Sequence, residues 1–161
     1  MKKPRVLMAD DHSLILAGLR KLVEEECEVV GTVEDGRALV EAAQQLRPDL
    51  ILLDISMPLL NGLEAARQLR SLAPESKLIF LTMHASPTYA TGGFQAGASG
   101  YLLKRSAAAE LSLAIRSVLQ GQYYLTPLLT KDVLDSFLNL SVGERGKPAS
   151  QALTSRQREV L

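Results

Sequence analysis

The sequence predicts an α/β protein with a doubly wound parallel sheet of five strands, each followed by a helix, in the (βα)5 arrangement. Two observations carry this prediction. Short apolar runs alternate five times with longer amphipathic stretches between residue 5 and about residue 120, and several runs are continuously apolar, as central strands covered on both faces are. The predicted strands are Val6–Ala9, Glu28–Val33, Asp49–Leu53, Lys77–Leu81 and Gly100–Leu103.

Helices are predicted between the strands because apolar residues recur there every three or four positions. The fourth helix differs from the others, since it contains two adjacent glycines, Gly92 and Gly93, which cost about 2 kcal/mol relative to alanines in a helix interior. We therefore expect this helix to be short, frayed or mobile. Apolar positions of the other helices include Leu19 and Val23, Leu39 and Ala43, Ala66 and Leu69, and Ile115 and Val118.

The chain divides into three parts. Residues 1–122 are predicted to form the α/β domain, 123–152 a helix with a flexible linker, and 153–161 the start of a second domain. The extra helix begins at Thr126-Pro127, because threonine is a fair N-cap and proline suits the first helical position. Its apolar stripe either packs on the protein itself or forms a dimer contact. The stripe consists of Leu129, Val133, Phe137 and Leu140.

Composition excludes several classes of protein. Apolar residues make up 47% and charged residues 22% of the 161 positions, which excludes a disordered chain and a disulfide scaffold. Eighteen basic residues offset eighteen acidic ones, so charge alone predicts no binding to nucleic acid or membranes. Cys27 is the single cysteine, which indicates a buried thiol and a reducing compartment. Because the amino terminus also lacks a signal-peptide pattern, we expect a cytoplasmic protein.

Polar residues stand at the carboxyl ends of four predicted strands, namely Asp10 and Asp11, Asp54, Thr82 and Lys104. For the strand order 2-1-3-4-5, the ligand crevice lies beyond the ends of the first and third strands. Three carboxylates would meet there, and a hard divalent cation such as Mg²⁺ would relieve their repulsion. A neighbouring lysine and hydroxyl suit phosphoryl transfer, and Asp54 is the best nucleophile because a carboxylate can form an acyl phosphate.

Five motifs in register resemble the receiver domain of two-component response regulators, which has a flavodoxin-like fold. The motifs are Ala9-Asp10-Asp11-His12, Leu53-Asp54-Ile55-Ser56-Met57-Pro58, Asn61-Gly62, Leu81-Thr82-Met83-His84, and Ala96-Gly97-Ala98-Ser99-Gly100-Tyr101-Leu102-Leu103-Lys104. The terminal residues Leu153–Leu161 resemble the start of a LuxR-type helix-turn-helix. This second resemblance places the chain in the NarL/FixJ subclass, with a truncated DNA-binding domain.

The resemblance implies a role for each residue of the metal site. Asp54 would accept a phosphoryl group from a sensor histidine kinase. Asp11 and Asp54 would bind Mg²⁺ directly, Asp10 would bind it through a water molecule, and Ser56 would contribute its backbone carbonyl. His12 and His84 are interpreted as loop residues, because magnesium prefers oxygen ligands.

The resemblance also implies a switch. Lys104 would be the counter-ion of the phosphoryl group and Thr82 its hydroxyl donor, while Tyr101 occupies the aromatic switch position, where the ring turns inward when Thr82 moves. The protein would act only on its own aspartate and would control a C-terminal DNA-binding domain. It would bind DNA only through that domain and would bind no membrane, with homodimer formation on phosphorylation left open.

The sequence also bears on three alternative functions. A phosphatase of the haloacid dehalogenase type needs an aspartate two positions after the nucleophile, where this chain has Ser56. A Rossmann domain needs a glycine-rich loop after the first strand, which is absent. The third alternative, a receiver-like interaction module that works without phosphorylation, stays open. For Asp10 and Asp11, a role only as helix caps is a further, less favoured interpretation.

Overall fold

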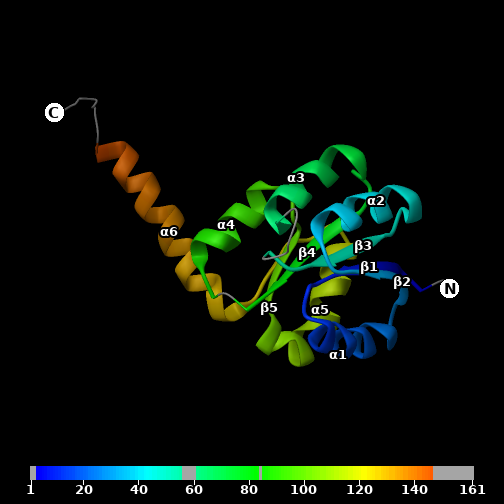
Figure 1. The fold of residues 1–161 in the computed structure, drawn as a ribbon. Helices are drawn as coiled ribbons and strands as arrows, with labels where there is room; N and C mark the ends of the chain where they lie inside the picture. Colours follow the sequence, from blue (N-terminus) through cyan, green and yellow to red (C-terminus); the bar gives the residue numbers. More distant parts are fainter. Residues whose placement is uncertain (1–2, 56–60, 84, 147–161) are drawn as a thin grey trace. The chain divides into compact units, whose positions relative to one another are not determined.

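The computed structural model describes residues 3–55, 61–83 and 85–146 (Figure 1). Ser56, His84 and the predicted start of the second domain at 153–161 lie outside this range. Residues up to Thr126 form one compact unit, and the helix α6, Pro127–Gly146, belongs to a second unit. The predicted extra helix is therefore present and begins at Pro127.

The described strands form one parallel sheet in the order β2-β1-β3-β4-β5-β6. This arrangement confirms the predicted doubly wound fold and its strand order, and adds a sixth strand at the edge. The strands are β1 Arg5–Ala9, β2 Glu28–Val33, β3 Leu50–Leu53, β4 Lys77–Thr82, β5 Gly100–Leu103 and β6 Tyr124–Leu125.

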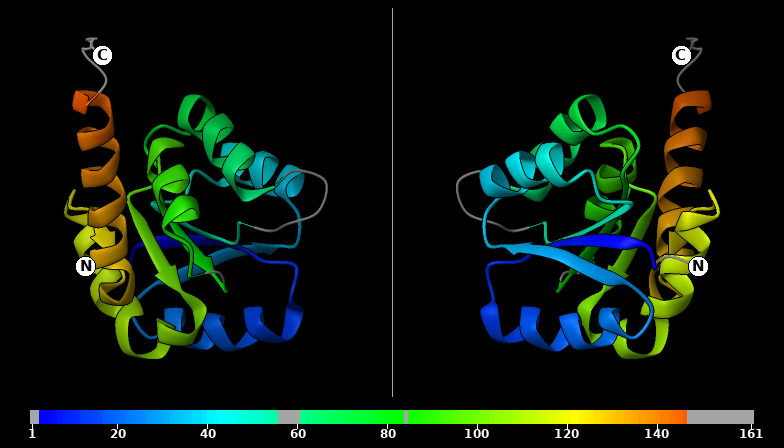
Figure 2. Two further views of the ribbon diagram at one scale, coloured as in Figure 1. Left: turned by 90° about the vertical axis from the view of Figure 1, so that its left-hand side faces the viewer. Right: turned by 90° about the vertical axis from the view of Figure 1, so that its right-hand side faces the viewer.

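Helices cover both faces of the sheet, with α1 and α5 on one face and α2, α3 and α4 on the other (Figures 1 and 2). A short 3-10 helix, η1 (Lys104–Ser106), connects β5 to α5. The helices are α1 Ser13–Glu24, α2 Gly36–Leu46, α3 Gly62–Leu72, α4 Pro87–Gln95 and α5 Ala107–Leu119. The part of the chain that the structure describes contains no helix long and apolar enough to cross a membrane.

The central strands are buried on both faces, which explains their continuously apolar sequences. Val6 and Met8 of β1 pack in a cluster with α1 and α5, while the intervening Leu7 is also fully buried. Successive side chains of a strand point to opposite faces, so each central strand contributes to two cores. Cys27 lies in the first of these clusters, where burial raises the pKa of its thiol, as expected for a structural cysteine.

The strand β6 ties the end of the first unit to the sheet. Its backbone pairs with β5, and the N–H of the following Thr126 donates to the carbonyl of Tyr101 at 3.0 Å. The hydroxyls of Tyr124 and Thr126 both donate to Oε1 of Glu110 on α5, at 2.8 and 2.9 Å. Burial, together with the Glu110 carboxylate, raises the pKa of Tyr124 to about 12. The chain therefore leaves the unit from a point bonded directly to Tyr101.

The helix α4 is continuous across both glycines, from Pro87 to Gln95. Ser86 caps its first turn by accepting the N–H of Tyr89 at 3.4 Å, and Pro87 occupies the first turn. At nine residues the helix is short, as predicted. Its mobility stays a prediction.

The adjacent glycines of α4 differ in their surroundings, and substitution is expected to separate them. A Cβ at Gly93 would lie 2.9 Å from Cδ2 of Phe80, whereas a Cβ at Gly92 would meet nothing closer than a Leu63 methyl at 3.9 Å. We expect G92A to raise the free energy of unfolding by about 0.5 kcal/mol and G93A to lower it by about 1–2 kcal/mol. Urea unfolding followed by circular dichroism measures both, and equal effects would contradict the close packing at Gly93.

Candidate functional site

Two buried aspartates lie side by side at the carboxyl edge of the sheet. Asp10 follows β1 and Asp54 follows β3, and these strands are paired so that Ala9 stands opposite Leu53. The backbone N–H of Asp54 donates to the carbonyl of Ala9 at 3.0 Å, which fixes the two carboxylates at the same level. The residues are only 2% and 3% exposed, so neither charge is stabilised by bulk water.

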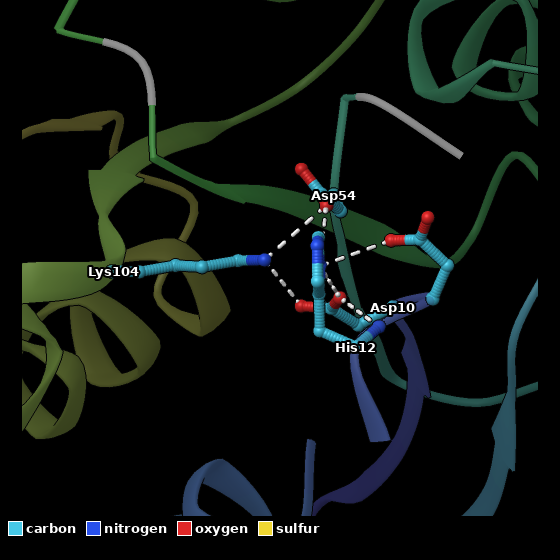
Figure 3. Close-up of polar contacts among 5 residues, drawn as sticks. Asp10, His12, Asp54 and Lys104 are labelled. Atoms are coloured by element: carbon cyan, nitrogen blue, oxygen red, sulfur yellow. Dashed lines mark hydrogen bonds and ion pairs between the residues drawn. The ribbon is translucent and has the colours of Figure 1, made fainter. Parts of the chain in front are cut away.

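Lys104 pairs with both aspartates from the carboxyl end of β5. Its Nζ lies 2.5 Å from Oδ2 of Asp10 and 3.2 Å from Oδ2 of Asp54, and its side chain is 4% exposed (Figure 3). The lysine opens η1, directly after β5, and extends along the sheet edge to reach strands β1 and β3. Residues 10, 54 and 104 therefore meet as the sequence predicted, in a buried cluster of two negative charges and one positive charge.

Asp11 and His12 complete the cluster on its exposed side. The Nδ1 atom of His12 lies 3.1 Å from Oδ1 of Asp10 and 3.1 Å from Oδ1 of Asp11, and 4.0 Å from Oδ2 of Asp54. His12 is the N-cap residue of α1, and neither aspartate caps this helix with its side chain. His12 was interpreted from the sequence as a loop residue rather than a metal ligand, and it does lie outside the helix, with its ring beside the two aspartates.

The donor set of the cluster fits a divalent cation. One carboxylate oxygen from each of Asp10, Asp11 and Asp54, together with a ring nitrogen of His12, lie within 4.8 Å of one another. Two of these carboxylates are buried beside a single lysine, so a hard cation would supply the missing positive charge. The resemblance to receiver domains implies Mg²⁺ at a cluster of this kind. Ser56, the remaining predicted ligand, lies outside the described residues.

Thr82 and Tyr101 form a second pair next to the cluster, on β4 and β5. Both residues are fully buried, and the hydroxyl of Tyr101 is hydrogen-bonded to Thr82. The ring of Tyr101 packs against Phe80 with their centroids 6.4 Å apart. Burial raises the pKa of Tyr101 well above its ordinary value, so the hydroxyl stays protonated and can donate. In this structure the ring of the predicted switch residue already lies inward.

A glycine at the start of α3 holds the backbone of Asp54 in place. The N–H of Gly62 donates to the carbonyl of Ile55 at 2.7 Å, and a Cβ at this position would lie 2.1 Å from the carbonyl oxygen of Asp54. The preceding Asn61 caps the helix by accepting the N–H of Glu64 at 2.9 Å. The motif Asn61-Gly62 was visible in the sequence, but the close approach that requires the glycine was not.

Known proteins resemble this chain over most of its length. The family model for the response regulator receiver domain matches residues 6–116. The chain is 39% identical to the transcriptional regulatory protein DegU of Brevibacillus brevis over 140 residues, covering 86% of this chain and 59% of DegU. It is 35% identical to the transcriptional regulatory protein MctR of Rhizobium johnstonii over 161 residues, covering 99% of this chain and 72% of MctR. The chain thus spans about three fifths of the length of DegU.

Solved structures show the same fold. A LuxR-family two-component response regulator from Aurantimonas superposes with a TM-score of 0.81 at 29% identity, covering 85% of this chain and 99% of that structure. The receiver domain of NarL from Mycobacterium tuberculosis gives a TM-score of 0.72 at 31% identity, covering 76% of this chain and all of that domain. Response regulators are signalling proteins that are generally not enzymes. The chain belongs to the response regulators of two-component systems, and its relatives are of the NarL/LuxR type.

Proposed function

We propose that this receiver is a phosphorylation switch in which Asp54 accepts a phosphoryl group from a sensor histidine kinase in a Mg²⁺-dependent step. The observation that carries the proposal is the pairing of the buried Asp54 carboxylate with Lys104 Nζ, 3.2 Å away, beside two further carboxylates. In the transfer, an oxygen of Asp54 forms a bond to phosphorus as the bond from phosphorus to the donor's imidazole nitrogen breaks. The electron pair of that bond returns to the imidazole.

The residues around Asp54 would divide the remaining work. Asp11 and Asp54 would hold Mg²⁺ directly, Asp10 would hold it through a water molecule, and Ser56 would contribute its carbonyl. When bound, the ion offsets the charge on the phosphoryl oxygens. Lys104 already lies beside Asp54 and would pair with an oxygen of the transferred group. Because this lysine is buried, its charge is screened little by water.

Thr82 and Tyr101 would convert the new charge into a change of packing. The Thr82 hydroxyl is now bonded to Tyr101 and would turn toward a phosphoryl oxygen, which is a stronger acceptor. The Tyr101 ring already lies inward, the position expected of the activated state. Phosphorylation would therefore stabilise an arrangement that the protein can adopt alone, as in a population shift.

The proposal extends to the whole protein. Residues 1–122 would be the receiver, 123–152 the linker and 153–161 the start of a LuxR-type DNA-binding domain. That domain, when phosphorylation of the receiver allows it, would bind DNA and regulate transcription. The regulator would act in the cytoplasm, where the kinase domain supplies the phosphoryl group, and homodimer formation on phosphorylation stays open.

Intact-mass spectrometry after incubation with acetyl phosphate and Mg²⁺ tests the phosphoacceptor. We expect one phosphoryl adduct in the wild-type protein and in D132N, a control at an exposed aspartate of α6, and none in D54N. The adduct should also disappear when EDTA removes the divalent cation. If the wild-type protein gains no adduct, the chain is a phosphorylation-independent interaction module instead.

A further inference from the structure

The imidazole of His12 lies beside the carboxylates of the candidate metal site, where the proposed function gives it no role. Its Nδ1 atom lies among the oxygens of Asp10, Asp11 and Asp54, while Lys104 approaches from the other side (Figure 3). Asp10 lies between the lysine and the imidazole, because its Oδ2 contacts Lys104 and its Oδ1 contacts His12. Oδ2 of Asp10 is therefore paired with the lysine, and Oδ1 faces the imidazole.

The backbone holds the ring in this place. The N–H of His12 donates to Oδ1 of Asp10 at 2.9 Å, so the main chain turns back toward the carboxylate. As the N-cap residue of α1, His12 could use its side chain to cap the helix, but it makes no such bond. The ring is half exposed, which leaves room for it to adjust when an ion binds.

The distances match those between ligands of one octahedral ion. For ligands about 2.1 Å from a metal, neighbouring ligands lie about 3.0 Å apart and opposite ligands about 4.2 Å apart. Nδ1 of His12 is 3.1 Å from an oxygen of Asp11, as neighbouring ligands are, and 4.0 Å from an oxygen of Asp54, close to the value for opposite ligands. The Asp10 oxygen that lies 3.1 Å from Nδ1 would reach the ion through a water molecule. An ion among these atoms could bind the nitrogen with the oxygens.

We propose that His12 is a direct ligand of the bound divalent cation, through Nδ1. The proposal rests on the metal site of the proposed function and deepens it. The ring would carry its proton on Nε2, which leaves the lone pair of Nδ1 for the ion. An imidazole ligand favours first-row transition metals over Mg²⁺, which prefers oxygen. This receiver should consequently discriminate in favour of Mn²⁺ and Co²⁺ more than a site with oxygen ligands alone.

Pulsed electron paramagnetic resonance of the Mn²⁺-loaded protein tests the ligand without measuring activity. A directly bound imidazole gives a nitrogen modulation of the electron spin echo. We expect this modulation in the wild-type protein and in H84Q, which alters the chain's other histidine, and its loss in H12Q. A wild-type spectrum without the modulation, or its persistence in H12Q, would overturn the proposal.

Calorimetric titration provides a second measurement. The H12Q substitution is expected to weaken Co²⁺ binding about tenfold and Mg²⁺ binding less than about threefold, whereas equal losses for both ions would exclude a selective nitrogen ligand. The two proposals fail separately. A nitrogen modulation without a phosphoryl adduct would support His12 as a ligand and contradict the phosphoacceptor role of Asp54. An adduct without the modulation would support the phosphoacceptor role and contradict the histidine ligand.

Discussion

Replacing Lys104 with methionine is expected to lower the free energy of unfolding by about 3 kcal/mol in metal-free buffer. The lysine is paired with two carboxylates that are almost completely buried, those of Asp10 and Asp54. Removing one partner of a buried ion pair leaves charge without compensation, which costs about 3–5 kcal/mol. Methionine keeps most of the volume of the side chain, so the loss reports mainly on charge.

The same variant should respond more strongly to Mg²⁺ than the wild-type protein does. Without the lysine, a bound cation is the main remaining source of positive charge for Asp10 and Asp54, so the ion should restore part of the lost stability. Urea unfolding monitored by circular dichroism, with and without Mg²⁺, measures both effects. The chain has no tryptophan, so circular dichroism is the practical probe.

A second lysine variant shows whether the loss of stability depends on the position of the lost charge. Lys21 is exposed on α1, and K21M is expected to change the free energy of unfolding by less than about 0.5 kcal/mol. If K104M were as stable as the wild-type protein in metal-free buffer, the two aspartates would not both be charged there. The electrostatic account of the site would then be wrong.

The position of Asp10, Asp54 and Lys104 could be predicted from the sequence because each interrupts an apolar pattern at the end of a strand. Parallel strands bring their carboxyl ends to one edge of the sheet. The end of each apolar run in the sequence therefore predicts which residue lies at that edge. The strands β1, β3, β4 and β5 were predictable for the same reason, whereas the edge strand β2 is only partly buried. No contact had to be known in advance, because burial on both faces leaves a continuous apolar run.

Other features depend on contacts that no local pattern records. The strand β6 has only two residues, too few to show a periodic pattern. It is held by bonds from Tyr124 to Ser99 and Glu110, which are distant in sequence. His12 is near the acidic cluster because its backbone turns back to Asp10. The continuous helix α4 depends on Gly93 fitting against Phe80. A glycine lowers helix propensity wherever it stands, so its benefit appears only when the opposing side chain is known.

Replacing Gly62 with alanine is expected to be among the most damaging changes of a single methyl group in this protein. The added Cβ would lie 2.1 Å from the carbonyl oxygen of Asp54 and 2.7 Å from Cα of Ile55. Both are backbone atoms, so no rotation of a side chain relieves the overlap. We expect the free energy of unfolding to fall by about 3 kcal/mol, at the upper end of the cost of overpacking.

The damage should extend to function, because the backbone that must move carries the proposed phosphoacceptor. Moving Asp54 away from Gly62 would alter its distance to Lys104, which is 3.2 Å from Nζ to Oδ2. We therefore expect G62A to form much less phosphoryl adduct than the wild-type protein under conditions where it is still folded. Urea unfolding gives the stability, and intact-mass spectrometry at low temperature gives the adduct.

A glycine-to-alanine substitution elsewhere in the chain serves as a control, with the opposite expected effect on the free energy of unfolding. Gly18 lies on the exposed side of α1, and a Cβ there would meet no atom within 4 Å. Because alanine is the better helix former, G18A is expected to raise the free energy of unfolding by about 0.5–1 kcal/mol and to leave the adduct unchanged. If G62A were as stable as G18A, the helix α3 could move away from Asp54 at little cost. The tight contact between α3 and the backbone of Asp54 would then not be a requirement of the fold.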